Sequence, residues 1–118
     1  MEEKYLPLGS VVLLKGAKHR ISIIGFCFTI KEKNNRQYDY VGVPYPEGFL
    51  GISHIMYFDH SDIESIINVA FSDDEEKDFK KRLKETVKRI TKDGDSKYID
   101  ESKIKDFIKN GDIKYEQY

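Results

Sequence analysis

Apolar and polar residues follow a strand-like pattern through the first half of the chain. Three apolar runs rich in Val, Ile, Phe and Tyr cover residues 10–14, 20–30 and 37–45, and stretches rich in Gly, Asn and Lys separate them. Such runs, bounded by turn-forming residues, predict β-strands. Two shorter strands are predicted at about residues 55–58 and 66–71. The pattern therefore predicts about five strands before residue 72.

The second apolar run changes the phase of its alternation near its middle. Ile21 and Ile23 share one face of the expected strand, whereas Ile24 and Phe26 share the other. Either both faces are buried, or a bulge near Gly25 re-aims the strand. Long, two-faced strands with a central glycine are typical of small barrels. We therefore expect a small, strongly curved antiparallel sheet that is either open or curled into an SH3-like barrel.

The remaining residues predict helices. Ser72 and Glu75 have the spacing of a capping box, which starts a helix that runs to about Thr91. A short helix is predicted over about residues 100–110, before Gly111. The predicted fold class is therefore α+β, a sheet followed by one long and one short C-terminal helix. The apolar residues of the long helix form a single stripe at helical spacing: Phe79, Leu83, Val87 and Ile90.

Charge is concentrated in the predicted helical part. Residues 1–71 carry 7 Lys+Arg and 8 Asp+Glu, whereas residues 72–118 carry 13 of each. The chain has 118 residues, the length of one domain with one modest core. The charged part has too few apolar residues to fold alone. We therefore interpret residues 1–118 as a single domain, in which a β-rich body (5–71) carries a charged helical tail (72–118) packed on it.

Composition excludes several classes of protein. The net charge is -1, so the chain as a whole has no pull towards nucleic acid or anionic membranes. A single cysteine cannot form an intramolecular disulfide bond. The N-terminal residues do not resemble a signal peptide, and no apolar run reaches the roughly 18 residues that span a bilayer. These features favour a soluble, cytoplasmic protein without membrane insertion.

Motifs for catalysis or metal binding are weak. The densest polar cluster is Asp59, His60 and Asp62, with His54 upstream, and capping of a turn explains it better than metal binding. Cys27 lies in mid-strand between two phenylalanines, which favours a buried structural thiol over a nucleophile. The sequence has neither a nucleophile elbow nor a phosphate-binding loop. We therefore predict no enzymatic activity, no catalytic residues, no cofactor and no metal.

Basic residues of the long helix raise a nucleic-acid alternative. Together with exposed Tyr38 and Tyr40 they would suit RNA or single-stranded DNA. Acidic residues on the same helix neutralise them, and ordinary surface pairing is the simpler interpretation. Nucleic acid is therefore the disfavoured partner. The basic residues are Lys80, Lys81, Arg82, Lys84, Lys88 and Arg89.

Aromatic and apolar residues near the third strand favour a protein partner. Tyrosine offers a large contact area at low entropic cost, although half-buried strand positions also favour it. Phe49 and Leu50 lie in a loop flanked by glycines, where two adjacent large apolar side chains need a partner or the C-terminal helix to cover them. The predicted protein-binding residues are Tyr38, Tyr40, Tyr45, Phe49, Leu50 and Tyr57.

Three stretches carry a family resemblance: YLPLGSVVLLKG at residues 5–16, Ile23-Ile-Gly, and YDYVGVPYPEG at residues 38–48. With them, the chain resembles a family of small Gram-positive bacterial proteins known mainly as a domain of unknown function. The resemblance covers about residues 5–90. It offers no catalytic residues, and the glycines and prolines of these motifs are interpreted as residues that shape the backbone.

Genes of that family lie beside type VII secretion genes, among LXG-type toxins, their small helical partners and immunity proteins. The resemblance therefore implies a non-enzymatic accessory role, with a chaperone or adaptor for an LXG toxin or its targeting partners as the leading hypothesis. An immunity protein that neutralises a cognate toxin and a nucleic-acid-binding SH3-like domain are the alternatives. The sequence leaves the oligomeric state open.

Overall fold

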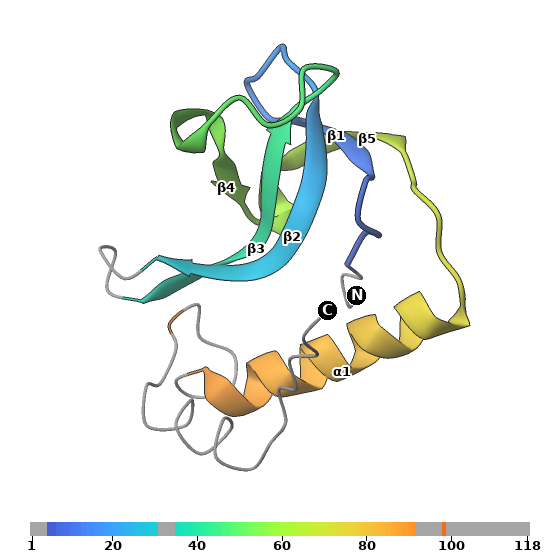
Figure 1. Cartoon of the computed structure of the whole chain (residues 1–118). Coiled ribbons are helices and arrows are strands. Elements are labelled where there is room, and N and C mark those ends of the chain that lie inside the picture. Colours follow the sequence, from blue (N-terminus) through green and yellow to red (C-terminus); the bar gives the residue numbers. More distant parts are fainter. Residues whose placement is uncertain (1–4, 31–34, 92–97, 99–118) are drawn as a thin grey trace. The chain divides into compact units, whose positions relative to one another are not determined.

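The computed structural model describes residues 5–30, 35–91 and 98 (Figure 1). Its strands and helix confirm the predicted α+β class. In chain order the elements are β1 (Val11–Leu14), β2 (Ile21–Ile30), β3 (Arg36–Pro44), the 3₁₀ turn η2 (Ile52–His54), β4 (Met56–Phe58), the 3₁₀ turn η3 (His60–Asp62), β5 (Ile63–Asn68) and the helix α1 (Asp74–Ile90).

The five strands form one sheet in the order β4-β3-β2-β1-β5. The pairs β1–β2, β1–β5 and β3–β4 are antiparallel. Within the described residues β4 and β5 lie at opposite edges of this order and do not pair with each other. The sheet is therefore open, and the alternative of a closed SH3-like barrel is not confirmed.

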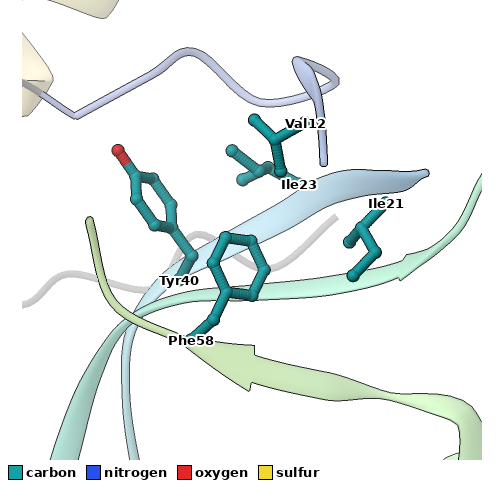
Figure 2. Packing of buried hydrophobic residues seen from close by; sticks show 5 residues of the cluster. All are labelled: Val12, Ile21, Ile23, Tyr40 and Phe58. Carbon is teal, nitrogen blue, oxygen red and sulfur yellow. The ribbon is translucent and has the colours of Figure 1, made fainter. Parts of the chain in front are cut away.

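A compact apolar cluster forms the core of the sheet (Figure 2). Tyr40 and Phe58 face each other across the β3–β4 pair, with their ring centroids 5.4 Å apart in a stacked arrangement. Val12, Ile21 and Ile23 complete the cluster from β1 and β2, and all five side chains are fully buried. In Figure 2 the hydroxyl of Tyr40 lies at the end of its ring that points away from the aliphatic side chains.

The strand β2 changes its buried face along its length. Ile21 and Ile23 are fully buried, whereas the next residue, Ile24, is exposed. Phe26 then packs against the core, with its ring centroid 6.0 Å from that of Tyr40. Strict alternation would place Ile23 and Phe26 on opposite faces. The arrangement agrees with the predicted change of phase.

Two glycines let neighbouring strands approach closely. A Cβ atom at Gly42 would lie 2.4 Å from Cγ2 of Ile21 and 2.9 Å from the carbonyl oxygen of Ser22. A Cβ atom at Gly25 would lie 2.7 Å from Cγ1 of Val41. Because carbon atoms do not approach this closely without displacement, both positions require glycine for packing rather than for backbone freedom.

The fifth strand begins earlier than its sequence pattern predicts. In the structure Asp59 and Asp62 cap each other around the short turn η3. The backbone N–H of Asp59 donates to Oδ2 of Asp62 at 2.8 Å. Since this reciprocal cap ends the turn at residue 62, Ile63 enters the sheet and packs against the core. The strand predicted at residues 66–71 is therefore β5, Ile63–Asn68.

The helix α1 starts close to the predicted capping box, but with different partners. The backbone N–H of Glu76 donates to Oδ1 of Asp73 at 2.9 Å, so Asp73 caps the first turn. Ser72 donates a hydrogen bond to the carboxylate of Glu76 rather than pairing with Glu75. The short helix predicted over about residues 100–110 lies outside the described residues.

The chain divides into two compact units. The first comprises residues 1–28 and 38–80, and the second comprises residues 29–37 and 81–118. The first turns of α1 therefore belong to the first unit, where the ring of Phe79 lies 6.2 Å from that of Phe26. Whether the chain behaves as one domain stays a prediction.

Candidate protein-binding surface

The longest described connection between strands joins β3 to β4, and we call residues 45–55 the β3–β4 loop. Pro44 ends β3 and Pro46 follows, and neither residue has a backbone N–H to continue strand pairing. The N–H of Gly48 donates back to the carbonyl oxygen of Pro44 at 2.7 Å, which closes a tight turn. Gly48 and Gly51 have φ values of +82° and +117°, a region that glycine adopts without strain. The glycines and prolines of the loop therefore determine its conformation.

Large apolar side chains are exposed along this loop. The exposed fraction is 65% for Phe49, 51% for Leu50 and 81% for Ile52. Tyr45 at the start of the loop and Met56 at the start of β4 are each 39% exposed. Single exposed apolar residues are ordinary, but several in one short loop mark an interaction site.

Contacts with the β1–β2 turn (residues 15–20) hold the start of the loop in place. The N–H of Tyr45 donates to the carbonyl oxygen of Arg20 at 2.9 Å. The guanidinium carbon of Arg20 lies 4.9 Å from the centre of the Tyr45 ring, in cation–π contact. Nε2 of His19 lies 2.9 Å from the carboxylate of Glu47. The two connections lie side by side at one end of the sheet (Figure 1), so the β1–β2 turn supports the loop.

The His19–Glu47 contact sets the charge of the loop. The hydrogen bond from His19 lowers the pKa of Glu47 below its ordinary value, assisted by the backbone N–H of Glu47 and by the charges of His19 and Arg20. The carboxylate is therefore ionised at neutral pH and already has a partner. Glu47 is the one acidic residue of the β3–β4 loop.

A second stretch of exposed apolar residues follows the other edge of the sheet. It contains large side chains that are at least half exposed, on β5 and on the segment that follows it. These residues are Ile66, Ile67, Val69 and Phe71. An exposed apolar edge strand is a potential site for pairing with another chain, so this stretch competes with the loop as the candidate site.

Two irregularities make β5 a poor template for strand pairing. Along the β1–β5 pair, Val11 lies opposite Asn68 but Val12 lies opposite Ile66, so Ile67 is an extra residue. A second shift leaves Glu64 as an extra residue. Bulges of this kind interrupt the regular row of backbone donors and acceptors, and proteins use them to protect sheet edges. We therefore assign the candidate protein-binding surface to the β3–β4 loop.

Three of the six predicted binding residues lie in the β3–β4 loop, and the other three, Tyr38, Tyr40 and Tyr57, lie on β3 and β4. Tyr45, Phe49 and Leu50 are exposed in the loop, where Phe49 and Leu50 were predicted, whereas Tyr45 was predicted at the end of the third strand. Tyr38 and Tyr57 are half-buried and form a separate pair, with ring centroids 5.9 Å apart. The structure therefore brings together the loop residues but not all of the predicted tyrosines.

The prediction for Tyr40 is wrong, because this side chain is fully buried. Its ring stacks on Phe58, and its hydroxyl finds polar partners within the protein. The hydroxyl oxygen accepts the N–H of Leu6 at 2.9 Å and lies 3.1 Å from Nδ1 of His60. A tyrosine whose hydroxyl is satisfied can occupy the core at little cost. Tyr40 therefore belongs to the core rather than to a binding surface.

Ile52 and Met56 are exposed apolar residues that the sequence prediction missed. Ile52 directly follows Gly51, which ends the glycine-flanked pair Phe49 and Leu50, so its sequence position carried a usable signal. No local sequence signal indicates that His19 and Arg20 support the loop, because the contact between His19 and Glu47 joins residues 28 positions apart.

The polar cluster around residue 60 has a structural role in the fold. Beyond the cap formed by Asp59 and Asp62, the N–H of His60 donates to Oδ2 of Asp39 at 2.9 Å. His54 is exposed and contacts Ser53. No group of three or more His, Cys, Asp or Glu residues that could hold a metal ion occurs within the described part of the chain. The side chain of Cys27 lies outside the described structure.

The buried position of Tyr40 also removes one of the two features on which the nucleic-acid alternative depended. That alternative needed Tyr38 and Tyr40 as an exposed stacking platform beside the basic helix. On the helix, Lys80 forms an ion pair with Glu76 at 3.1 Å. The paired tyrosine platform is therefore absent from the described residues.

The chain was compared with known proteins. It matches the family Domain of unknown function (DUF4176) over residues 5–79, which is more than half of its length. No curated protein and no solved structure shows a match. None of the helices within the described ranges is long and apolar enough to cross a membrane. The matched residues include all five strands, the β3–β4 loop and the start of α1, and the chain belongs to the DUF4176 family.

Proposed function

We propose that this protein is a non-enzymatic accessory protein that binds another protein through the β3–β4 loop. The observation that carries the proposal is the exposure of Phe49, Leu50 and Ile52 in one short loop. Large apolar side chains of this kind contribute favourable binding energy when a partner removes them from water. Exposed to water they contribute nothing to folding, so a partner is the simplest reason for their presence.

The support of the loop strengthens this proposal. A loop that is already ordered loses less conformational entropy when it binds than a loop that must become ordered. Tyr45 and Glu47, at the start of the loop, are held by Arg20 and His19, and Gly48 closes the turn. The loop is therefore presented in a defined conformation.

For the partner, we propose an LXG-type toxin or one of its small helical partners in type VII secretion. The family resemblance supplies this hypothesis, and a cytoplasmic chaperone or adaptor would act before export. A chaperone or adaptor would bind the N-terminal LXG region of the toxin. An immunity protein would instead bind the toxic C-terminal domain. The two roles therefore differ in which half of the toxin is bound.

The experiment compares three tagged proteins for capture of partners from the native cytoplasm. These are the wild-type chain, the variant Phe49→Asp/Leu50→Asp, and the control Ile66→Asp/Val69→Asp in the second exposed stretch. Captured proteins are identified by mass spectrometry, and the affinity for a purified LXG protein and its two halves is then measured by calorimetry. We expect the loop variant to lose at least about tenfold in affinity and the control to keep wild-type affinity.

Two results would contradict the proposal. One is an LXG protein, or any other stoichiometric partner, that binds the loop variant as tightly as the wild type. The other is binding that is lost only in the β5 control variant, which would move the site to the opposite edge of the sheet.

A further inference from the structure

We propose that the segment that docks on the β3–β4 loop is acidic, with large apolar residues set between its carboxylates. Lys18 and Arg20 of the β1–β2 turn would bind those carboxylates while Phe49, Leu50 and Ile52 bind the apolar residues. This inference rests on the proposed function of the loop and specifies the chemistry of its partner.

The charge of the β1–β2 turn is the first observation. The described segment from residue 5 to residue 30 contains Lys15, Lys18 and Arg20 and has no Asp or Glu. All three basic side chains are exposed. Within the described residues, none of them forms an ion pair. This end of the first unit therefore presents positive charge beside exposed apolar side chains.

The neighbouring carboxylate does not cancel this charge. Glu47 is paired with His19, and the adjoining turn carries Lys15, Lys18 and Arg20. The hydrogen bond from His19 is the main cause of the lowered pKa of Glu47, and the charge of Arg20 is a minor cause. One acidic group, Glu47, against Lys18 and Arg20 leaves a net positive charge, and an acidic partner would complement it.

The position of Arg20 suits recognition of a carboxylate. One face of its guanidinium group covers the ring of Tyr45 at 4.9 Å. The N–H donors of a guanidinium group point outward in its plane, so stacking on an aromatic ring leaves the edge available for a two-pronged contact with a carboxylate. Stacking also restricts the side chain before binding. Tyr45 thereby positions the guanidinium group of Arg20 at the start of the β3–β4 loop.

The observations favour an acidic peptide segment over other anionic partners. Recognition of anionic lipids typically uses clusters of about 4–8 basic residues, and the β1–β2 turn has three. Single-stranded nucleic acid binds to aromatic platforms beside long basic grooves, and Tyr40 lies in the core. A peptide with a few carboxylates and apolar anchors needs only the two features that this surface offers.

The test selects peptides of about 15 residues from a random display library on the immobilised full-length protein. Selections run in parallel on the wild type, on Phe49→Ala/Leu50→Ala, on Lys18→Glu/Arg20→Glu, and on the control Lys81→Glu/Arg82→Glu, which makes the same charge change on α1. We expect the wild type and the helix control to enrich acidic peptides with large apolar residues. We expect both loop-region variants to lose that enrichment.

The affinity of one enriched peptide is then measured by fluorescence anisotropy. We expect Lys18→Glu/Arg20→Glu to weaken binding at least about tenfold at low salt. The difference should shrink when the salt concentration is raised, because the contacts with Lys18 and Arg20 are exposed to screening.

The outcomes separate this inference from the proposed function. Peptides that depend on Phe49 and Leu50 but are neutral or basic, or that tolerate Lys18→Glu/Arg20→Glu, would overturn the acidic partner and leave the loop as a binding site. Enrichment that is unchanged in Phe49→Ala/Leu50→Ala would overturn both the acidic partner and the loop as a binding site. Self-association of the protein that depends on Phe49, or loop-dependent binding to phosphatidylglycerol vesicles without peptide enrichment, would also overturn the acidic peptide as occupant.

Discussion

The buried cluster around Tyr40 and Phe58 and the exposed residues of the β3–β4 loop are built from the same kinds of side chain. They lie close in sequence, since Phe49 falls between Tyr40 and Phe58. Tyr40 and Phe58 are fully buried because the β3–β4 ladder places them opposite each other on the core face of the sheet. Phe49 has no ladder partner and lies in a turn shaped by glycines, where 65% of its surface is exposed.

Strand register, rather than residue type, therefore decides which aromatic residues stabilise the fold. Side chains fixed by pairing on one face of a sheet fill the core, and their removal leaves a cavity. Side chains in the connection contribute area that only a partner can bury. Stability and recognition should therefore be separable by substitution.

The largest contrast should appear between Phe58→Ala and Phe49→Ala. Removing the buried ring of Phe58 should lower the free energy of unfolding by about 3–5 kcal/mol, because both transfer energy and close packing against Tyr40 are lost. Removing the exposed ring of Phe49 should change it by no more than about 0.5 kcal/mol. Urea unfolding followed by circular dichroism measures both values. Comparable losses in the two variants would show that the loop residues belong to the folding core.

A smaller effect should follow from Tyr40→Phe, which keeps the ring and removes the hydroxyl. The N–H of Leu6 loses its acceptor and Nδ1 of His60 loses its neighbour. We expect a loss of about 1–2 kcal/mol in the free energy of unfolding and faster hydrogen exchange at the Leu6 amide. The matched control is Tyr45→Phe, which alters an exposed tyrosine and should change stability by no more than about 0.5 kcal/mol. Equal stability of both variants and the wild type would show that the hydroxyl of Tyr40 does not stabilise the core.

The sequence predicted the strands and their approximate positions because alternation and turn residues are local signals. It also located Phe49 and Leu50, since two large apolar residues between glycines are conspicuous without any structure. It could not place Tyr40, because alternation groups residues by face without saying which face is covered. The answer depends on the pairing with β4 and on the distant partners Leu6 and His60.

Other features of the site depend on contacts between residues far apart in the sequence. The β1–β2 turn reads as a short basic connection, and nothing local indicates that Arg20 lies over Tyr45. The two bulges that make β5 irregular arise from its pairing with β1, which a single strand pattern does not contain. The sequence therefore indicated the apolar half of the candidate surface, and the structure added its basic half.

The smallest predicted effect concerns the ion pair that supports the loop. Because His19 lowers the pKa of Glu47, the carboxylate of Glu47 should titrate below the ordinary glutamate value of 4.5 in the wild type. A lowered pKa in the folded state means that the pair contributes above about pH 4.5 and that its contribution is lost as the pH falls through the folded-state value. His19→Ala should return the titration midpoint of Glu47 towards 4.5, and His54→Ala, which alters another exposed histidine, should leave it unchanged. Carbon-detected NMR titration of the Glu47 carboxyl group measures each midpoint, and the amide signals of Phe49 and Leu50 report whether the loop responds. A wild-type midpoint at or above 4.5 would show that His19 does not hold Glu47 in solution. In that case the loop would be less ordered before binding than the core is, and the contrast between the two regions would extend from exposure to rigidity.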